Sequence, residues 1–269
     1  MTTTSAAARL VAAPPAHGLL AWRLVQRNVL SGRRNWLLVV SGFFEPVFYL
    51  LGLGVGVGAL VGGVEVDGRT VSYREFVAPA MLAAAAMYGA VYESTINVFA
   101  KLKFARTYEG VLATPLRVRD VALGELVYAL MRGALYATGF MVVMLALGLV
   151  ESPWAVAAVP AALLVGAAFG GVGLVAVTFV RSWADTEFVN VVTLPLFLFS
   201  ATFIPLASYP ESIRWVLPLT PLYHGVELLR GLTLGMVGPG LLLHAAYLLA
   251  MGAAGLVVAD RRLERLLLK

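Results

Sequence analysis

Residues 100–120 read AKLKFARTYEGVLATPLRVRD and separate two strongly apolar stretches of the chain. A segment this rich in basic residues, between apolar runs, is typical of a loop on the cytoplasmic side of a membrane. Residues 106–113 suit a helix, which Thr114-Pro115 ends because the residue before a proline is driven out of the α region. We therefore expect a short cytoplasmic helix here. It either docks a soluble partner or belongs to a solvated loop that only fixes the topology.

The composition indicates a membrane protein. Of the 269 residues, 60% are hydrophobic and 13% are charged, and the mean hydropathy is +0.86, which is outside the range of soluble domains. Because a helix of about 20 residues crosses the hydrocarbon core, the apolar runs predict an all-α integral membrane fold with six transmembrane helices. The predicted spans are residues 35–60, 77–99, 121–150, 154–180, 188–204 and 237–259. Residues 18–269 would form a single transmembrane domain.

The chain before the first span has two parts. Residues 1–17 are rich in threonine, alanine and proline and predict a disordered tail. Residues 18–34 place Trp22, Val25 and Val29 on one helical face with arginines beside it. This pattern predicts an amphipathic helix that lies in the membrane interface.

Four prolines interrupt residues 205–232, so this segment cannot form one continuous helix. We expect short external helices that re-enter the membrane, because irregular backbone there must pack on protein or line a wet cavity. A helix from Pro221 would stop at Gly231. The residues assigned to this external gate are Pro221, His224, Glu227 and Arg230. Glu227 and Arg230 either pair locally or brace the exit of a transport path.

Four ionisable residues fall inside the predicted spans: Glu45, Glu93, Glu125 and Arg132. Such groups are costly in a membrane and usually face the bundle interior or water. Arg132 and Glu45 lie at similar depths, counted from the same side, which predicts that they pair. The set forms either a polar vestibule for the head group of an amphiphile or an interhelical ion pair that fixes packing.

Several chemistries find no support in the sequence. There is no cysteine, and the three histidines are widely separated, so we expect no metal site. There is no G-x-x-x-x-G-K-[ST] loop, so the chain shows no ATPase of its own. The basic residues are grouped at the polar interruptions and form no stripe for binding nucleic acid.

Two blocks of sequence resemble a known family. The matching segments are 92–95 (YEST), 106–109 (RTYE), 114–115 (TP), 123–126 (LGEL), 218–224 (PLTPLYH) and 227–230 (ELLR). They are similar to the permeases of ABC-2-type exporters, closest to the branch of nodulation-factor (lipo-chitooligosaccharide) export permeases. The resemblance spans roughly residues 22–263, and the central block is its most specific part.

The resemblance implies that residues 100–120 are the coupling segment that contacts a separate ABC ATPase subunit, which binds ATP and Mg²⁺. The coupling residues would be Arg106, Thr107, Tyr108, Glu109, Val111, Leu112, Thr114 and Pro115. Tyr108, Val111 and Leu112 would fill an apolar groove of that partner, and Glu109 would make a charged contact. The resemblance also implies export and a second permease copy, in a homodimer or in a heterodimer with a paralogue.

We therefore expect a permease in the bacterial inner membrane, in contact with membrane lipids, that is not itself an enzyme. Its substrate would be amphipathic, either a lipid-linked saccharide or a hydrophobic natural product or drug. The alternative is an ion-coupled secondary transporter or channel that uses the intramembrane Glu and Arg residues. A membrane enzyme would need a convergent nucleophile and base or a metal set, which the sequence does not show.

The distribution of basic residues predicts the orientation. With six spans, fifteen of the 20 lysines and arginines fall on the side of residues 100–120 and four on the other, which places both termini in the cytoplasm. In intact cells a membrane-impermeant maleimide should label Asp67→Cys and Ser208→Cys and leave Thr107→Cys unlabelled. The native chain has no cysteine to remove. The opposite labelling pattern would reverse the orientation.

Overall fold

The structure, a computed structural model, describes residues 17–32, 36–66 and 68–268. The helices are α1 (His17–Gly32), α2 (Trp36–Gly56), α3 (Gly58–Val61), α4 (Tyr73–Tyr92), α5 (Thr107–Leu112), α6 (Val118–Ala146), α7 (Ala158–Val177), α8 (Glu187–Leu198), α9 (Glu211–Arg214), α10 (Pro221–Leu234) and α11 (Gly240–Leu267). The strands β1 (Gly63–Val66) and β2 (Arg69–Ser72) form an antiparallel hairpin. The predicted disordered tail lies outside the described residues except for His17.

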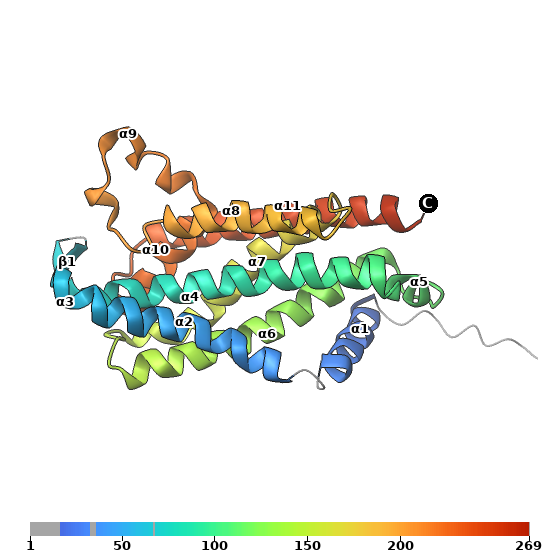
Figure 1. Ribbon diagram of the computed structural model, residues 1–269, viewed down its shortest axis with the longest axis horizontal. Helices are drawn as coiled ribbons and strands as arrows, with labels where there is room; N and C mark the ends of the chain where they lie inside the picture. Colours follow the sequence, from blue (N-terminus) through green and yellow to red (C-terminus); the bar gives the residue numbers. More distant parts are fainter. Residues whose placement is uncertain (1–16, 33–35, 67, 269) are drawn as a thin grey trace, which may run out of the picture.

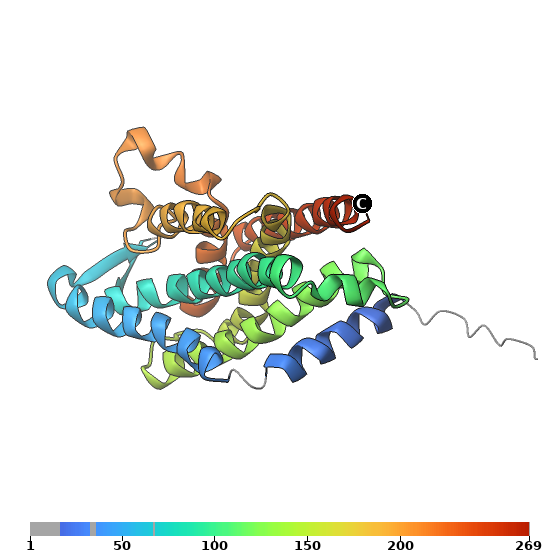
Figure 2. The same cartoon turned by 45° about the vertical axis from the view of Figure 1, so that its right-hand side comes forward.

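The long helices run along the longest axis of the molecule (Figure 1). The helix α5 and the C-terminus lie at one end, and the hairpin and α9 lie at the other (Figure 1). A helix is present at the predicted position as α1, which packs along α6 (Figure 2); its location in the membrane interface stays a prediction. Two π-helical turns, Glu93–Asn97 and Ala100–Phe104, continue α4 towards α5. Shorter 3-10 turns connect other helices at Pro153–Ala157, Ala184–Thr186, Leu206–Ser208 and Leu217–Leu219.

Four described segments are long and apolar enough to cross a membrane: Tyr73–Phe104, Val118–Ala146, Pro153–Val177 and Gly240–Leu267. The predicted first span corresponds to α2, whose region contributes a shorter apolar segment, Pro46–Val61. The predicted fifth span corresponds to α8, which has 12 residues and is therefore about 18 Å long, short of a hydrocarbon core of about 30 Å. The helical membrane architecture is confirmed, but the count of six spans is not established.

Side chains at the helix ends explain where the long helices begin. The Ser72 hydroxyl accepts a hydrogen bond from the Glu75 N–H, and the Glu75 carboxylate accepts one from the Ser72 N–H. This capping box satisfies two backbone donors at the start of α4. At the start of α6, the Asp120 carboxylate accepts a hydrogen bond of 2.9 Å from the Arg117 N–H.

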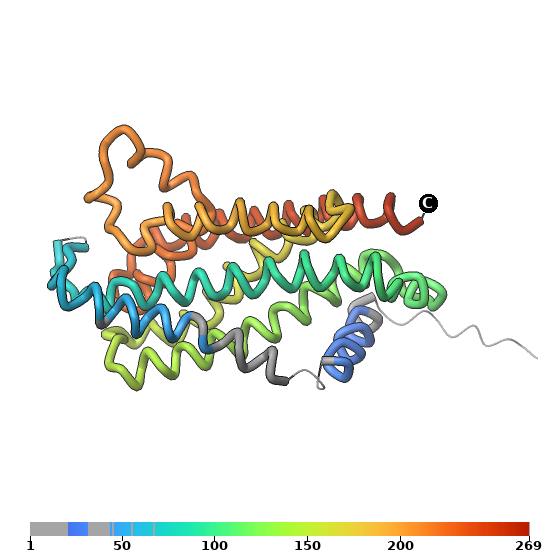
Figure 3. Tube along the Cα trace, viewed as in Figure 1, coloured from blue at the N-terminus to red at the C-terminus, as the bar shows by residue number. Residues whose placement is uncertain are grey.

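The helix α10 lies inside the bundle, against α4, α7 and α11. Its fully buried side chains include Leu222, Val226 and Leu229. The predicted stop at Gly231 is wrong, because α10 continues to Leu234 and ends at Gly235, whose φ is 76°. Gly231 instead allows a close approach to α11, since a Cβ there would lie 2.6 Å from the Leu241 side chain. The segment before α10 loops away from the bundle (Figure 3).

The helices α7 and α11 touch backbone to backbone. A Cβ added to Gly255 would lie 2.7 Å from the carbonyl carbon of Gly171, and one added to Gly171 would lie 2.8 Å from the carbonyl oxygen of Gly252. Backbone atoms cannot move aside as the end of a flexible side chain can. These three glycines therefore set the separation of the two helices, as small residues do at membrane helix interfaces.

Replacing Gly255 with valine should push α11 away from α7 and lower the stability of the protein. Overpacking of this kind costs about 1–3 kcal/mol, which a thermal melt in detergent would register as a lower Tm. Gly52→Val is the matched control, because nothing lies within 4 Å of a Cβ at Gly52. An equal loss of stability in both variants would contradict this account of the α7–α11 contact.

Candidate functional site

The short helix predicted within residues 100–120 is present as α5. Arg106 precedes it with a left-handed φ of 44°, so the chain turns sharply out of the second π-helical turn. At the other end, the Thr114 hydroxyl donates a hydrogen bond of 2.5 Å to the carbonyl of Val111. The helix is thus defined on both sides by local backbone geometry.

The two faces of α5 have different environments. Tyr108 and Val111 are buried and Leu112 is half-buried, in a cluster shared with α1, α6 and α11. The exposed coupling residues are Arg106, Glu109, Thr114 and Pro115. The prediction that Tyr108 and Val111 fill a groove of the partner is therefore wrong. A helix of six residues has too few contacts of its own, so its apolar side chains hold it to the bundle instead.

A buried carboxylate, that of Glu125 on α6, fixes α5 in place. The Tyr108 hydroxyl donates to Glu125 Oε1 at 3.0 Å. Lys101 Nζ and Asn28 Nδ2 donate to Glu125 Oε2 at 2.6 Å and 3.1 Å. Glu125 is only 2% exposed, so these donors replace the water that an ionised carboxylate would otherwise bind. Four elements meet here: α1, the second π-helical turn, α5 and α6.

The hydroxyl of Tyr108 is a permanent donor in this cluster. Burial, and then the negative charge of Glu125, raise the pKa of Tyr108 well above its ordinary value. The phenol therefore keeps its proton at physiological pH and can always donate to the carboxylate. A weaker contact lies beside it, because Arg27 Nη2 donates to the Thr107 hydroxyl at 3.4 Å.

A second ion pair lies further along α6, where Arg132 binds Glu93 in the first π-helical turn. Asn97 also donates to Glu93 at 2.8 Å, and Arg132 donates to the Tyr136 hydroxyl at 2.9 Å. Arg132 thus has an acidic partner, but that partner is Glu93. The predicted pairing with Glu45 stays a prediction, because the side chain of Glu45 lies outside the described residues. Equal depth in two helices does not determine which of their faces meet.

At the opposite end of the bundle, Arg230 of α10 is buried. Its guanidinium group donates to Glu227 at 2.5 Å and to the Ala201 carbonyl at 2.9 Å. It also lies 4.0 Å from the centre of the Phe76 ring. The local pair predicted for Glu227 and Arg230 is confirmed, and Pro221 occupies the first turn of α10 as predicted. Arg230 in addition joins α10 to α4 and to Ala201, where the chain has a left-handed φ of 55° after α8.

Two histidines that are distant in the sequence meet beside this contact. Nδ1 of His224 on α10 lies 2.8 Å from Nδ1 of His244 on α11, and the Tyr247 ring stacks on His224 with centroids 3.9 Å apart. A cavity of about 230 Å³ is lined by His244 together with Glu227 and Arg230, among others. No pattern in the sequence pointed to His244, because the two histidines belong to different helices and share no spacing pattern.

Four described helices are long and apolar enough to cross a membrane, and this defines the class of multi-pass membrane proteins. Residues 20–234 match the sequence profile of the ABC-2 type transporter family. The chain belongs to this family and is the membrane subunit of an ABC transporter, a type of subunit that in general works with an ABC ATPase.

Curated relatives match the chain over most of its length. It is 35% identical over 231 residues to nodulation protein J of Rhizobium meliloti (strain 1021), covering 84% of this chain and 85% of that protein. It is 31% identical over 263 residues to nodulation protein J of Sinorhizobium fredii (strain NBRC 101917 / NGR234), covering 97% and 98%. The protein of the same name from Rhizobium leguminosarum bv. viciae is 32% identical over 262 residues, covering 96% and 99%. The resemblance carried by the central block is thus confirmed.

The contact between Glu93 and Arg132 can be tested with a double-mutant cycle. Arg132→Ala leaves an unpaired carboxylate in a low-dielectric interior, which should cost about 3–5 kcal/mol. The double variant with Glu93→Ala removes both charges and should lose clearly less than the sum of the two single variants. Unfolding followed in detergent would measure the three losses.

A second double-mutant cycle, between Arg132 and Glu45, is the control for the cycle between Arg132 and Glu93. Its coupling energy should be smaller, because Glu93 already binds the guanidinium group. Additive losses for Glu93 and Arg132, or a larger coupling for Glu45, would contradict the observed pair.

Proposed function

We propose that this chain is the permease of an ATP-driven exporter in the bacterial inner membrane, with both termini in the cytoplasm. A separate ABC ATPase, which binds ATP and Mg²⁺, would power it, because the chain has no phosphate-binding loop. The observation that carries the proposal is that the two faces of α5 differ. Its inner face is fixed to Glu125 through Tyr108, while its outer face presents Glu109 and Arg106 to a partner.

The contacts behind α5 provide a route for mechanical work. Two ion pairs join the extension of α4 to α6: Lys101 with Glu125 near α5, and Glu93 with Arg132 further along. Glu125 and Arg132 are seven residues apart on one continuous helix, a distance of about 10 Å. A displacement of α5 acts on Glu125 first, and α6 then moves the second pair as well. Such a chain of rigid elements and polar contacts is the physical basis of coupling between sites.

The proposed substrate is amphipathic, either a lipid-linked saccharide or a hydrophobic natural product or drug. Arg132 supports a polar entry for its head group. Its Nε is buried and has no hydrogen-bond partner within the described ranges of the chain, while the side chain as a whole is 25% exposed. The guanidinium carbon also lies 5.8 Å from the centre of the Tyr136 ring. An unused donor beside an aromatic ring suits a polar head group, and such intramembrane charges commonly mark substrate pathways. A second permease copy, identical or a paralogue, would enclose the path.

Reversing the charge at Glu109 should prevent capture of the ATPase. Glu109 is exposed, so Glu109→Lys should leave membrane insertion and thermal stability intact. It should reduce co-purification of the partner ABC ATPase, and it should abolish export and substrate-stimulated ATP hydrolysis. Glu211→Lys in α9 is the matched control, because it makes the same change on an exposed residue at the other end of the bundle.

Tyr108→Phe separates binding from transmission. It removes only the hydrogen bond to Glu125, worth about 1.5–3 kcal/mol for a charged acceptor, and leaves the outer face of α5 unchanged. The variant should still capture the ATPase but should stimulate it less. If Glu109→Lys captures the ATPase and exports normally, the coupling assignment is wrong and ion-coupled transport becomes the better explanation.

A further inference from the structure

The contact between His224 and His244 joins the start of α10 to the second turn of α11, in the half of the bundle away from α5 (Figure 1). The two Nδ1 atoms lie 2.8 Å apart, the distance of a direct hydrogen bond. Aromatic rings surround both imidazoles: Tyr247 stacks on His224, and the centre of the Tyr223 ring lies 5.9 Å and 6.0 Å from the centres of the two histidine rings. These rings hold the imidazoles in the orientation that brings the Nδ1 atoms together.

The pair is open to solvent on the His244 side. His244 is half-buried and lines the cavity of about 230 Å³ described above, together with Glu227 and Arg230. His224, its partner, is buried. A proton from solvent can therefore reach the pair through the cavity while both helices stay folded.

No carboxylate in the described ranges forms an ion pair with either histidine. The charged groups that share the cavity with His244 are Glu227 and Arg230, and these two bind each other. The other elements packed against α10 add no charge to the contact. The helix α7 and the turns at residues 153–157 and 217–219 contain no ionisable residue. The charged residues of α4 and α8 form hydrogen bonds elsewhere: Arg74 with Gly54, Glu75 with Ser72 and Glu187 with Asn190.

The number of protons on the two rings decides whether the contact can exist. When both rings are neutral, one Nδ1 donates its hydrogen to the lone pair of the other. One added proton makes this bond charge-assisted and stronger. With a second added proton each Nδ1 carries a hydrogen and neither can accept, so two like-charged donors would face each other across 2.8 Å. The contact therefore tolerates one added proton and is broken by the second.

The first turns of α11 are the part of the helix that this contact can release. From Gly252 onward, backbone contacts with α7 fix α11 in place. Residues 240–251 lie against α10 and the core through side chains. On the outer side of these turns, Leu242, Leu243 and Leu249 are exposed, so the described part of the chain does not block an outward movement. The helix thus has a pivot at its glycine contact and a polar attachment at the histidines.

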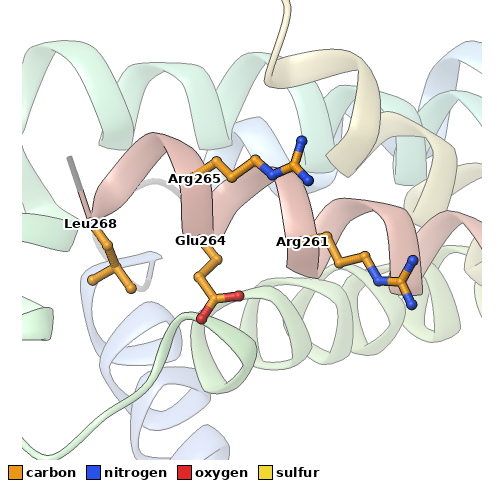
Figure 4. A pocket seen from close by; sticks show the side chains of 4 residues that line it. All are labelled: Arg261, Glu264, Arg265 and Leu268. Atoms are coloured by element: carbon orange, nitrogen blue, oxygen red, sulfur yellow. The ribbon is translucent and has the colours of Figure 1, made fainter.

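The charged residues at the C-terminal end of α11 are in a different setting. Arg261, Glu264 and Arg265 are exposed and line, with Leu268, a shallow cavity of about 420 Å³ (Figure 4). Water and salt screen exposed charges of this kind, so a change of charge there has little effect on how α11 packs. At the histidine contact, by contrast, an added proton acts directly on the packing of α11 against α10.

We propose that His224 and His244 form a pH-sensitive latch, which holds residues 240–251 against α10 and releases them when both rings are protonated. The release widens the cavity lined by Glu227, Arg230 and His244. The latch responds to acid at the end of the bundle away from α5. In the orientation proposed above, this end would face the side of the membrane opposite the ATPase, but the latch itself does not rest on ATPase coupling.

The test measures a distance in the full-length protein in nanodiscs. Spin labels are attached to Val156→Cys, in the turn packed against α10, and to Leu243→Cys beside His244; both positions are exposed, and the chain has no cysteine of its own. Double electron–electron resonance is recorded from about pH 8 to about pH 5, the range in which histidine changes its charge. A longer distance should grow as the pH falls. Its ratio to the shorter distance should rise by up to about tenfold per pH unit, as expected for the binding of one proton.

Two variants and two controls separate the latch from other effects of acid. Glutamine donates and accepts hydrogen bonds but does not titrate, so His244→Gln and His224→Gln should each keep the shorter distance at every pH. His17→Gln makes the same change at the remaining histidine, at the start of α1, and should keep the pH response. Labels at Val156→Cys and Val258→Cys, the latter beyond the glycine contact, should report a constant distance.

A wild-type distance that stays constant over the whole pH range would overturn the proposal. An unchanged pH response in His244→Gln would also overturn it, and because His244 is half-buried this variant remains informative if His224→Gln fails to fold. An equal change at Val258 would show that α11 moves as a whole, which contradicts a pivot at Gly252. These measurements need no ATPase and no substrate, so failure of the latch and failure of the exporter proposal are distinguishable.

Discussion

The buried carboxylate of Glu125 is the constraint on which the α5 end of the bundle depends. An ionised group inside a protein costs several kcal/mol unless donors surround it. Glu125 obtains its donors from Asn28, Lys101 and Tyr108, which belong to three different elements. The need to satisfy one side chain therefore fixes α1, the end of the α4 extension and α5 together. A fully satisfied polar cluster of this kind rigidifies one arrangement and excludes others, which suits the role proposed for α5 as the helix that receives a force from the ATPase.

The sequence predicted the parts of this structure that depend on length and local chemistry. The apolar runs located both ends of α6 and α7 to within about four residues, and Thr114-Pro115 marked the end of α5. They also located the start of α11, but this helix continues past the predicted end at residue 259 to Leu267. The sequence did not predict which faces of neighbouring helices meet, because the position of a residue along a helix does not determine how the helix is rotated about its axis. Tyr108 therefore turned out to face inward, towards Glu125, and Arg132 to bind Glu93.

The other end of the bundle was harder to predict because its contacts are long-range. Arg230 reaches the Ala201 carbonyl across 29 residues and the Phe76 carbonyl across 154, and neither separation leaves a pattern in the sequence. The same holds for His224 and His244, which meet only because α10 lies inside the bundle beside α11. The proline-rich composition predicted irregular backbone before α10, but the burial of α10 follows from packing against three helices at once.

The π-helical turns at Glu93–Asn97 and Ala100–Phe104 have a consequence for how the family can change over time. A π-helical turn holds one residue more than an α-helical turn, so it is what a single-codon insertion leaves in a helix that keeps its packing. Each inserted residue rotates everything after it by about 100° around the helix axis. In this chain the π-helical turns follow the packed length of α4 and precede α5, so a residue gained or lost there would reorient α5, the helix proposed to meet the ATPase, while the packed part of α4 stays as it was. If α5 contacts the ATPase as proposed, gain or loss of one codon in this stretch would be a simple genetic route by which the permease adjusts to a different ATPase.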